Sequence, residues 1–187
     1  MSRILRSPRS LRRSGSLRRS GRGRQRRPRR PKTSDPWAAL VRLLKARPRS
    51  EHEARTRLAA RGFADREVEA TIRLAKDAGL IDDRTFARLW IEDRVLHHPL
   101  ARDAVARELR EKGVPEAIAA AALVEFYPEH LEKELVWKLA RERYERLAGV
   151  DAEKRDRRTL GFLTRRGFRL GLSREIVRGL AKGEFDE

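Results

Sequence analysis

Apolar side chains recur every three or four residues from Trp37 onward, with polar residues between them. That period is the one of an α-helix with a single buried face. Glycines and prolines separate the periodic stretches, and these residues commonly end helices or begin them. The pattern predicts helices over about residues 36–46, 50–61, 65–79, 83–98, 101–112, 115–126, 129–147, 151–167 and from 172 onward. No stretch has a strand pattern and the chain has no asparagine, so nothing predicts a strand or a tight hairpin.

Several predicted helices begin with a residue whose side chain can accept hydrogen bonds from the first free amides. Ser50 and Glu53 have the spacing of a capping box, in which each side chain bonds the backbone N–H of the other residue. The other expected caps are Asp65, Asp82 or Asp83, and Asp151.

One short signature occurs three times near the ends of predicted helices: a leucine, two variable residues, a base, a glycine and an apolar residue. The glycines, Gly62, Gly113 and Gly167, are 51 and 54 residues apart. We expect the glycine to adopt a positive φ and the next apolar residue to fold back on the last turn. A fixed period of this length is typical of repeat proteins. We therefore predict an all-α fold of three tandem three-helix modules, covering residues 36–81, 82–127 and 128–187, which form an elongated, curved helical repeat.

The first 35 residues differ in composition from the rest of the chain. They hold 14 Lys and Arg residues and one acid, for a net charge of +13, whereas residues 36–187 carry +5. They contain too few apolar side chains to offset their conformational entropy, so we predict a disordered tail. Its role stays open between a solubilising extension, a transit peptide and an arm that binds single- or double-stranded nucleic acid. The arginines of such an arm are Arg12, Arg13, Arg18, Arg19, Arg26, Arg27, Arg29 and Arg30.

Composition and motifs exclude several classes of protein. The chain has no cysteine, which excludes disulfides, thiolate nucleophiles and nearly all structural zinc sites. No apolar run approaches the roughly 20 residues of a membrane-spanning helix. Motifs of zinc proteases, P-loop NTPases, serine hydrolases and dinucleotide-binding enzymes are absent. His97 and His98 are adjacent, so on a helix they point apart. We expect a cytoplasmic, monomeric, non-catalytic protein without metal or cofactor.

Arg94 is the most informative residue of the helical body. It follows Trp90 by four residues and Ile91 by three, which places it on the apolar face of its own helix. A guanidinium there needs a partner, because burying an unpaired charge is costly. One interpretation is a salt bridge with Asp82 or Asp83 or with an acid of another helix, and the other is a contact with a binding partner.

Other bases form a second group of candidates. Lys154, Arg158 and Arg165 share one helical face, and Arg155 and Arg166 lie near it. This face is either simply solvated or contacts phosphates or an acidic protein surface. The bases of the repeated signature either stabilise a helix C-terminus through its dipole or contact a ligand. The candidate partner-binding residues are Arg61, Arg94, Lys112, Lys154, Arg155, Arg158, Arg165 and Arg166.

The segment from Gly79 to Arg94, GLIDDRTFARLWIEDR, resembles the RecX family of bacterial regulatory proteins. It matches that family's Gly-Leu-(Leu/Ile)-Asp-Asp, its Phe-Ala-x-x-(Trp/Tyr) and an arginine four residues on. Other segments are similar in the same order and cover about residues 38–180. These are Arg49-Ser50-Glu51, Arg61-Gly62-Phe63, Lys112-Gly113-Val114 and Arg166-Gly167-Phe168.

The resemblance implies a regulator of the RecA recombinase, with a role in homologous recombination, DNA repair and the SOS response. Similar proteins bind RecA filaments on single-stranded DNA, lie along the filament groove, and restrain filament growth, ATP hydrolysis and strand exchange. The Arg-rich tail is not part of the family pattern. The alternative function is a sequence-nonspecific nucleic-acid-binding protein that acts through this tail.

Overall fold

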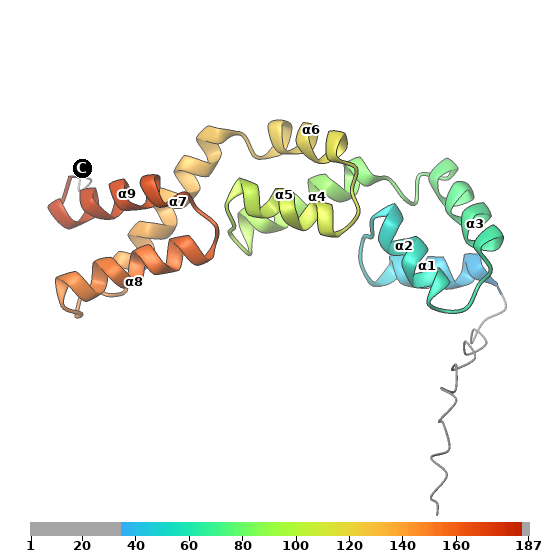
Figure 1. The fold of residues 1–187 in the computed structure, drawn as a ribbon, viewed down its shortest axis with the longest axis horizontal. Coiled ribbons are helices and arrows are strands. Elements are labelled where there is room, and N and C mark those ends of the chain that lie inside the picture. The colour runs from blue at the N-terminus through green and yellow to red at the C-terminus, as the bar shows by residue number, and fades with distance from the viewer. Residues whose placement is uncertain (1–34, 185–187) are drawn as a thin grey trace, which may run out of the picture.

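The computed structural model describes residues 35–184, and the regular secondary structure in this range is helical. Each helix lies where the apolar period predicts one (Figure 1). The helices are α1 (Pro36–Ala46), α2 (Glu51–Ala59), α3 (Asp65–Asp77), α4 (Asp83–Leu96), α5 (Arg102–Glu111), α6 (Glu116–Phe126), α7 (Glu129–Glu145), α8 (Ala152–Arg165) and α9 (Leu170–Lys182). The predicted tail, with the eight arginines named above as candidates for nucleic-acid binding, lies outside the described residues except for Asp35, which caps α1.

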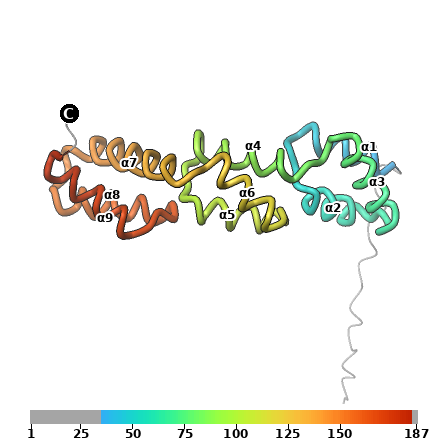
Figure 2. Tube along the Cα trace, turned by 90° about the horizontal axis from the view of Figure 1, so that it is seen from above, coloured from blue at the N-terminus to red at the C-terminus, as the bar shows by residue number. Residues whose placement is uncertain are grey.

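The helices pack in three groups of three, each with its own core. Leu40, Leu58 and Ile72 are buried among α1–α3. Ile91 and Leu109 are buried among α4–α6. The core of α7–α9 contains Val136, Leu163 and Phe168. Figures 1 and 2 show these groups following one another along the long axis, so the predicted all-α repeat of three three-helix modules is confirmed.

In the second and third modules the repeated signature ends a helix in the predicted way. Gly113 and Gly167 have φ of 74° and 85°. The amide of the following apolar residue folds back and donates to the carbonyl of the signature leucine, at 3.1 Å for Val114 to Leu109. The corresponding distance at the end of α8 is 3.3 Å. The glycine therefore allows a Schellman-type turn that buries the apolar residue after it.

Two of the predicted caps are wrong in detail. Asp65 does not cap α3, because Ala64 occupies the cap position and its N–H donates to Glu67 at 2.9 Å. The Ser50 hydroxyl accepts the Glu53 N–H at 3.1 Å, as predicted. The Glu53 carboxylate does not close the capping box, since it binds two basic side chains described below.

The two adjacent aspartates at the start of α4 have different partners. Asp82 caps α4 and accepts from the amides of Arg84 and Thr85. Asp83 instead accepts from the amide of Glu51, the first residue of α2, at 2.8 Å. Asp82 thus caps the start of its own helix, and Asp83 connects the first module to the second.

Among the helices between residues 35 and 184, none combines the length and hydropathy that crossing a bilayer requires.

Candidate functional site

Helix α5 connects the three modules through its two ends. At its C-terminal end, the Ser50 hydroxyl donates to the carbonyl oxygen of Lys112 at 2.5 Å. At its N-terminal end, the Ala101 N–H donates to the carbonyl oxygen of Arg166 at 2.9 Å. Ser50 and Ala101 are the N-caps of α2 and α5, and Lys112 and Arg166 are the C-caps of α5 and α8. The second helices of the modules therefore meet end to end twice, each time through a hydrogen bond from an N-cap residue to the carbonyl oxygen of a C-cap residue.

The base of the signature adds a side-chain bond to each joint. Lys112 Nζ lies 3.3 Å from Glu53 in the first joint. In the second joint, Arg166 donates to the carbonyl of Pro99 at 2.7 Å. Arg61 has no described module before it, and it donates to the carbonyl of Ala39 within its own module at 3.3 Å. Two of the three signature bases thus connect neighbouring modules.

The signature glycines leave room for these joints. A Cβ added to Gly113 would lie 2.3 Å from Cβ of His52 on α2. A Cβ added to Gly167 would lie 3.0 Å from Cβ of Ala104 on α5. The same residue therefore ends a helix and allows the preceding module to approach its backbone.

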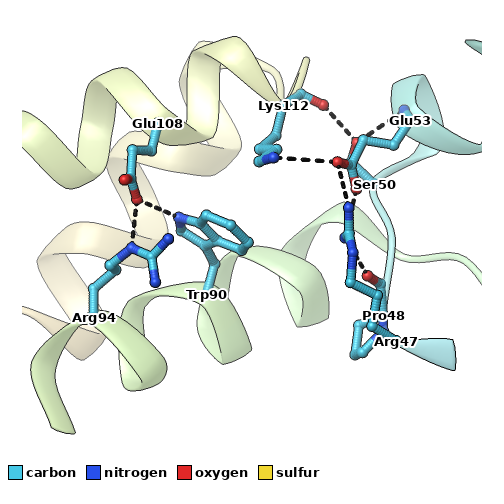
Figure 3. Close-up of polar contacts among 8 residues, drawn as sticks. All are labelled: Arg47, Pro48, Ser50, Glu53, Trp90, Arg94, Glu108 and Lys112. Atoms are coloured by element: carbon cyan, nitrogen blue, oxygen red, sulfur yellow. Dashed lines mark hydrogen bonds and ion pairs between the residues drawn. The ribbon is translucent and has the colours of Figure 1, made fainter. Parts of the chain in front are cut away.

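Glu53 is the main charged group of the first joint (Figure 3). Its carboxylate accepts hydrogen bonds from both terminal nitrogens of Arg47, at 2.8 and 2.9 Å, and also pairs with Lys112. Burial opposes the ionisation of Glu53, but the hydrogen bonds from Arg47 and Lys112 outweigh it and hold the pKa of Glu53 below its ordinary value. A charged Glu53 therefore stabilises the contact between the first and second modules.

Trp90 lies between two cations in the second module, as Figure 3 shows. The guanidinium carbon of Arg94 is 4.3 Å from the centre of the indole, and Lys112 Nζ is 4.9 Å from it. The indole N–H and Arg94 Nε both donate to one oxygen of Glu108, at 2.9 and 2.6 Å. This arrangement connects α4 to α5 and to the C-cap of α5, where the first joint is made.

Arg94 accordingly has the structural role that the sequence left open. Its partner is Glu108, an acid of another helix, together with its neighbour Asp93 at 2.5 Å. Of the two alternatives for a salt bridge, the acid of another helix is therefore the one found, and Asp82 and Asp83 instead accept backbone amides. Sequence reasoning missed Glu108. It is one of many acids on amphipathic helices, and no motif or spacing in its neighbourhood distinguishes it from the others.

The bases on α8 fall into two groups. Arg155 packs over the ring of Tyr144 at 4.0 Å, and Arg166 lies in the second joint. Lys154, Arg158 and Arg165 are exposed, and within residues 35–184 no carboxylate forms a salt bridge with them. Some of the candidate bases therefore bind other parts of the protein, whereas Lys154, Arg158 and Arg165 are exposed and have no described counter-ion. Residues 35–184 contain no group of three or more acids and histidines that could hold a metal ion.

Two family models match the chain: the first three-helix domain of RecX over residues 37–73, and the second over residues 82–123. The regulatory protein RecX of Amycolatopsis mediterranei is 37% identical over 136 residues, which is 73% of this chain and 77% of that protein. The regulatory protein RecX of Thermobifida fusca is 36% identical over 141 residues, 75% of this chain and 76% of that protein.

Solved RecX structures have the same fold. RecX from Lactobacillus salivarius superposes with a TM-score of 0.66 at 20% identity, over 79% of this chain and 95% of that one. A second RecX structure gives 0.63 at 23% identity, over 75% of this chain and 70% of that one. With relatives of this identity and coverage, the chain belongs to the RecX family.

Proposed function

We propose that this chain binds RecA-type recombinase filaments on single-stranded DNA and restrains filament growth, ATP hydrolysis and strand exchange. It acts in the cytoplasm as a monomer and catalyses no reaction itself. Membership of the RecX family, whose curated members are named regulatory proteins, supports the proposal.

The observation that carries this proposal is the elongated row of modules held by end-to-end joints. A helical polymer presents the same surface repeatedly along its groove. A ligand that touches it at several separated points gains affinity through effective concentration, provided that its own parts keep a fixed geometry. The joints supply that geometry through hydrogen bonds to the backbone carbonyl oxygens of Lys112 and Arg166, so the row acts as one extended binding element.

Lys154, Arg158 and Arg165 are the residues that we assign to the partner contact. They are exposed on one face of α8 and have no described counter-ion, so they can meet carboxylates of the recombinase without breaking an internal bond. Arg61, Arg94, Lys112, Arg155 and Arg166 act indirectly, because their side chains already bind within or between modules.

The test is DNA-dependent ATP hydrolysis by the cognate recombinase, titrated with the full chain. We expect inhibition by the unmodified protein and at least about tenfold weaker inhibition after K154E/R158E/R165E. A control with the same change in charge is R57E/R66E/R73E, which alters exposed bases of the first module. Absence of inhibition by the unmodified protein contradicts the proposed function. Equal effects of the two triple variants contradict the assignment to α8.

The net charge of +13 on residues 1–35 favours a second function, sequence-nonspecific binding to nucleic acid. In that case binding to any DNA or RNA is strongly salt-dependent, because each neutralised phosphate releases counter-ions. Removal of residues 1–34 then abolishes both the binding and any effect on the recombinase. That shortened chain keeps Asp35, the cap of α1, and every core residue of the three modules.

A further inference from the structure

A cavity of about 440 Å³ opens to solvent at the joint between the second and third modules. It lies where α4 ends, beside α5 and the C-cap of α8. Its lining residues are Arg94, His97, His98, Leu100, Glu108 and Arg166. Both histidines face the same cavity, although adjacent residues point apart on a helix, because α4 ends at Leu96 and they lie beyond it.

The only acid in this lining is already neutralised. Glu108 accepts the indole N–H of Trp90 and Nε of Arg94 on the same oxygen. Arg94 also pairs with Asp93, outside the cavity lining. No carboxylate remains to balance a further positive charge in this part of the described structure.

Arg166 supplies that further charge. One of its terminal nitrogens donates to the carbonyl of Pro99, and its guanidinium packs over the ring of Phe162 at 4.5 Å. It is half-buried, yet no carboxylate between residues 35 and 184 forms a salt bridge with it. A partly desolvated guanidinium with free N–H groups and no counter-ion favours an anion from solution.

We propose that this cavity binds a phosphate group. Arginine presents several N–H donors in a fixed plane, which suits phosphate oxygens, and the two imidazoles add donors at the end of α4. The volume lies within the range of about 300–1,000 Å³ that is usual for small-ligand sites, so it admits a phosphate together with the group attached to it. The source is a nucleic-acid backbone or a small phosphate compound. This site does not depend on the proposed function, because the isolated protein can bind phosphate without a recombinase.

The test uses NMR of the histidine side chains in the full chain, titrated with inorganic phosphate at constant ionic strength. The chain contains four histidines, and His52 and His130 lie outside the cavity, so they serve as internal controls. We expect saturable shifts of the His97 and His98 signals and none of comparable size for the other two. Equal or absent shifts at all four histidines overturn the proposal.

Variants identify the groups that bind. R166Q is expected to weaken phosphate binding at least about tenfold, since a hydrogen bond to a charged group is lost. R157Q removes an exposed base of α8 and is expected to leave phosphate binding unchanged. Arg166 also bonds Pro99 across the joint, so a second variant is needed that leaves this contact intact. H98Q then provides the independent test, because His98 is exposed and no described hydrogen bond of its side chain joins the modules. Unchanged binding in both R166Q and H98Q overturns the proposal.

Three further probes identify the source of the phosphate. A short oligothymidylate that shifts His97 and His98 and is displaced by phosphate assigns the site to a nucleic-acid backbone. Inorganic phosphate or pyrophosphate acting alone assigns it to small phosphate compounds. An oligoglutamate peptide that shifts both signals as strongly as phosphate overturns the proposal, because the cavity then selects carboxylates of an acidic protein.

Discussion

The hydroxyl of Ser50 donates to the carbonyl oxygen of Lys112, 62 residues later in the chain. The same oxygen atom of Ser50 accepts the N–H of Glu53 and so caps α2. Ser50 itself is completely buried. One side chain therefore starts a helix and holds the first module against the second.

Replacing Ser50 by alanine is expected to lower the free energy of unfolding by about 1–2 kcal/mol, because a helix cap and a buried hydrogen bond are lost together. Chemical denaturation measures this loss. Thr164→Ala is the control, since Thr164 is exposed and its hydroxyl bonds only to carbonyls of its own helix. A loss for Ser50→Ala no larger than that of the control would show that the joint does not contribute to stability.

Alanine substitutions at three glycines separate backbone strain from the close approach at the joint. Gly79 and Gly113 both have positive φ, but only at Gly113 does an added Cβ meet another module. Gly79→Ala is expected to cost about 1–2 kcal/mol from its backbone conformation alone. Gly113→Ala is expected to lower the free energy of unfolding clearly more than Gly79→Ala does. The added Cβ would clash with Cβ of His52, which is bonded directly to the backbone of α2 and cannot move aside.

The third substitution, Gly149→Ala, is the control, since that glycine lacks a positive φ and has no atoms within 4 Å of an added Cβ. Thermal and chemical denaturation give the free energies. Equal costs for Gly79→Ala and Gly113→Ala would contradict the close packing at the first joint.

The pKa of Glu53 predicts how acid weakens the first joint. Burial alone would raise this pKa, but the hydrogen bonds from Arg47 and Lys112 lower it overall. A carboxyl group whose pKa is lowered by folding stabilises the folded protein. The full stabilisation is present at pH values above the pKa of a glutamate in the unfolded chain, which is about 4.3. That stabilisation is lost as the pH falls through the lower folded value.

Glu53→Gln is therefore expected to destabilise the protein by about 1–2 kcal/mol near neutral pH. Its free energy of unfolding should also fall less steeply than that of the unmodified protein between about pH 5 and pH 3. Glu69→Gln, at an exposed acid paired only with Arg55, is the comparison. Parallel pH curves for the unmodified protein and Glu53→Gln would exclude this role.

The contact between Arg94 and Glu108 is expected to show strong coupling in a double-mutant cycle. Arg94→Met and Glu108→Gln, alone and combined, should give a coupling free energy of about 1–3 kcal/mol, since both groups are largely shielded from solvent. The more exposed pair Arg88 and Glu92 is the reference, with an expected coupling of about 0.3–0.5 kcal/mol. Coupling of similar size in the two pairs would argue against a structural role for Arg94.

The helices and their ends are predictable because their determinants are local. The apolar period fixes each buried face, and the glycine of the repeated signature fixes where a helix stops. The three-module architecture follows from the same short pattern, since the signature leucines Leu58, Leu109 and Leu163 are all completely buried.

The joints and the roles of individual charged residues are not predictable in this way. Asp83 looks like a cap of its own helix, yet it binds the amide of Glu51 in another module. Glu53 has the spacing of a capping box, yet Arg47 and Lys112 bind its carboxylate. These pairings depend on which groups lie close together once the modules have packed. The spacing of residues along the sequence does not show which groups these are.

The location of the activity on the chain is tested most directly by removing the tail. Residues 1–187 and residues 35–187 are titrated in parallel into the recombinase ATPase assay on single-stranded DNA, at about 50 and 200 mM salt. Similar inhibition by both proteins at both salt concentrations is the predicted result, because the proposal assigns filament binding to the helical modules. Inhibition by the full chain alone, lost at the higher salt concentration, would contradict it and show that the Arg-rich tail competes for DNA.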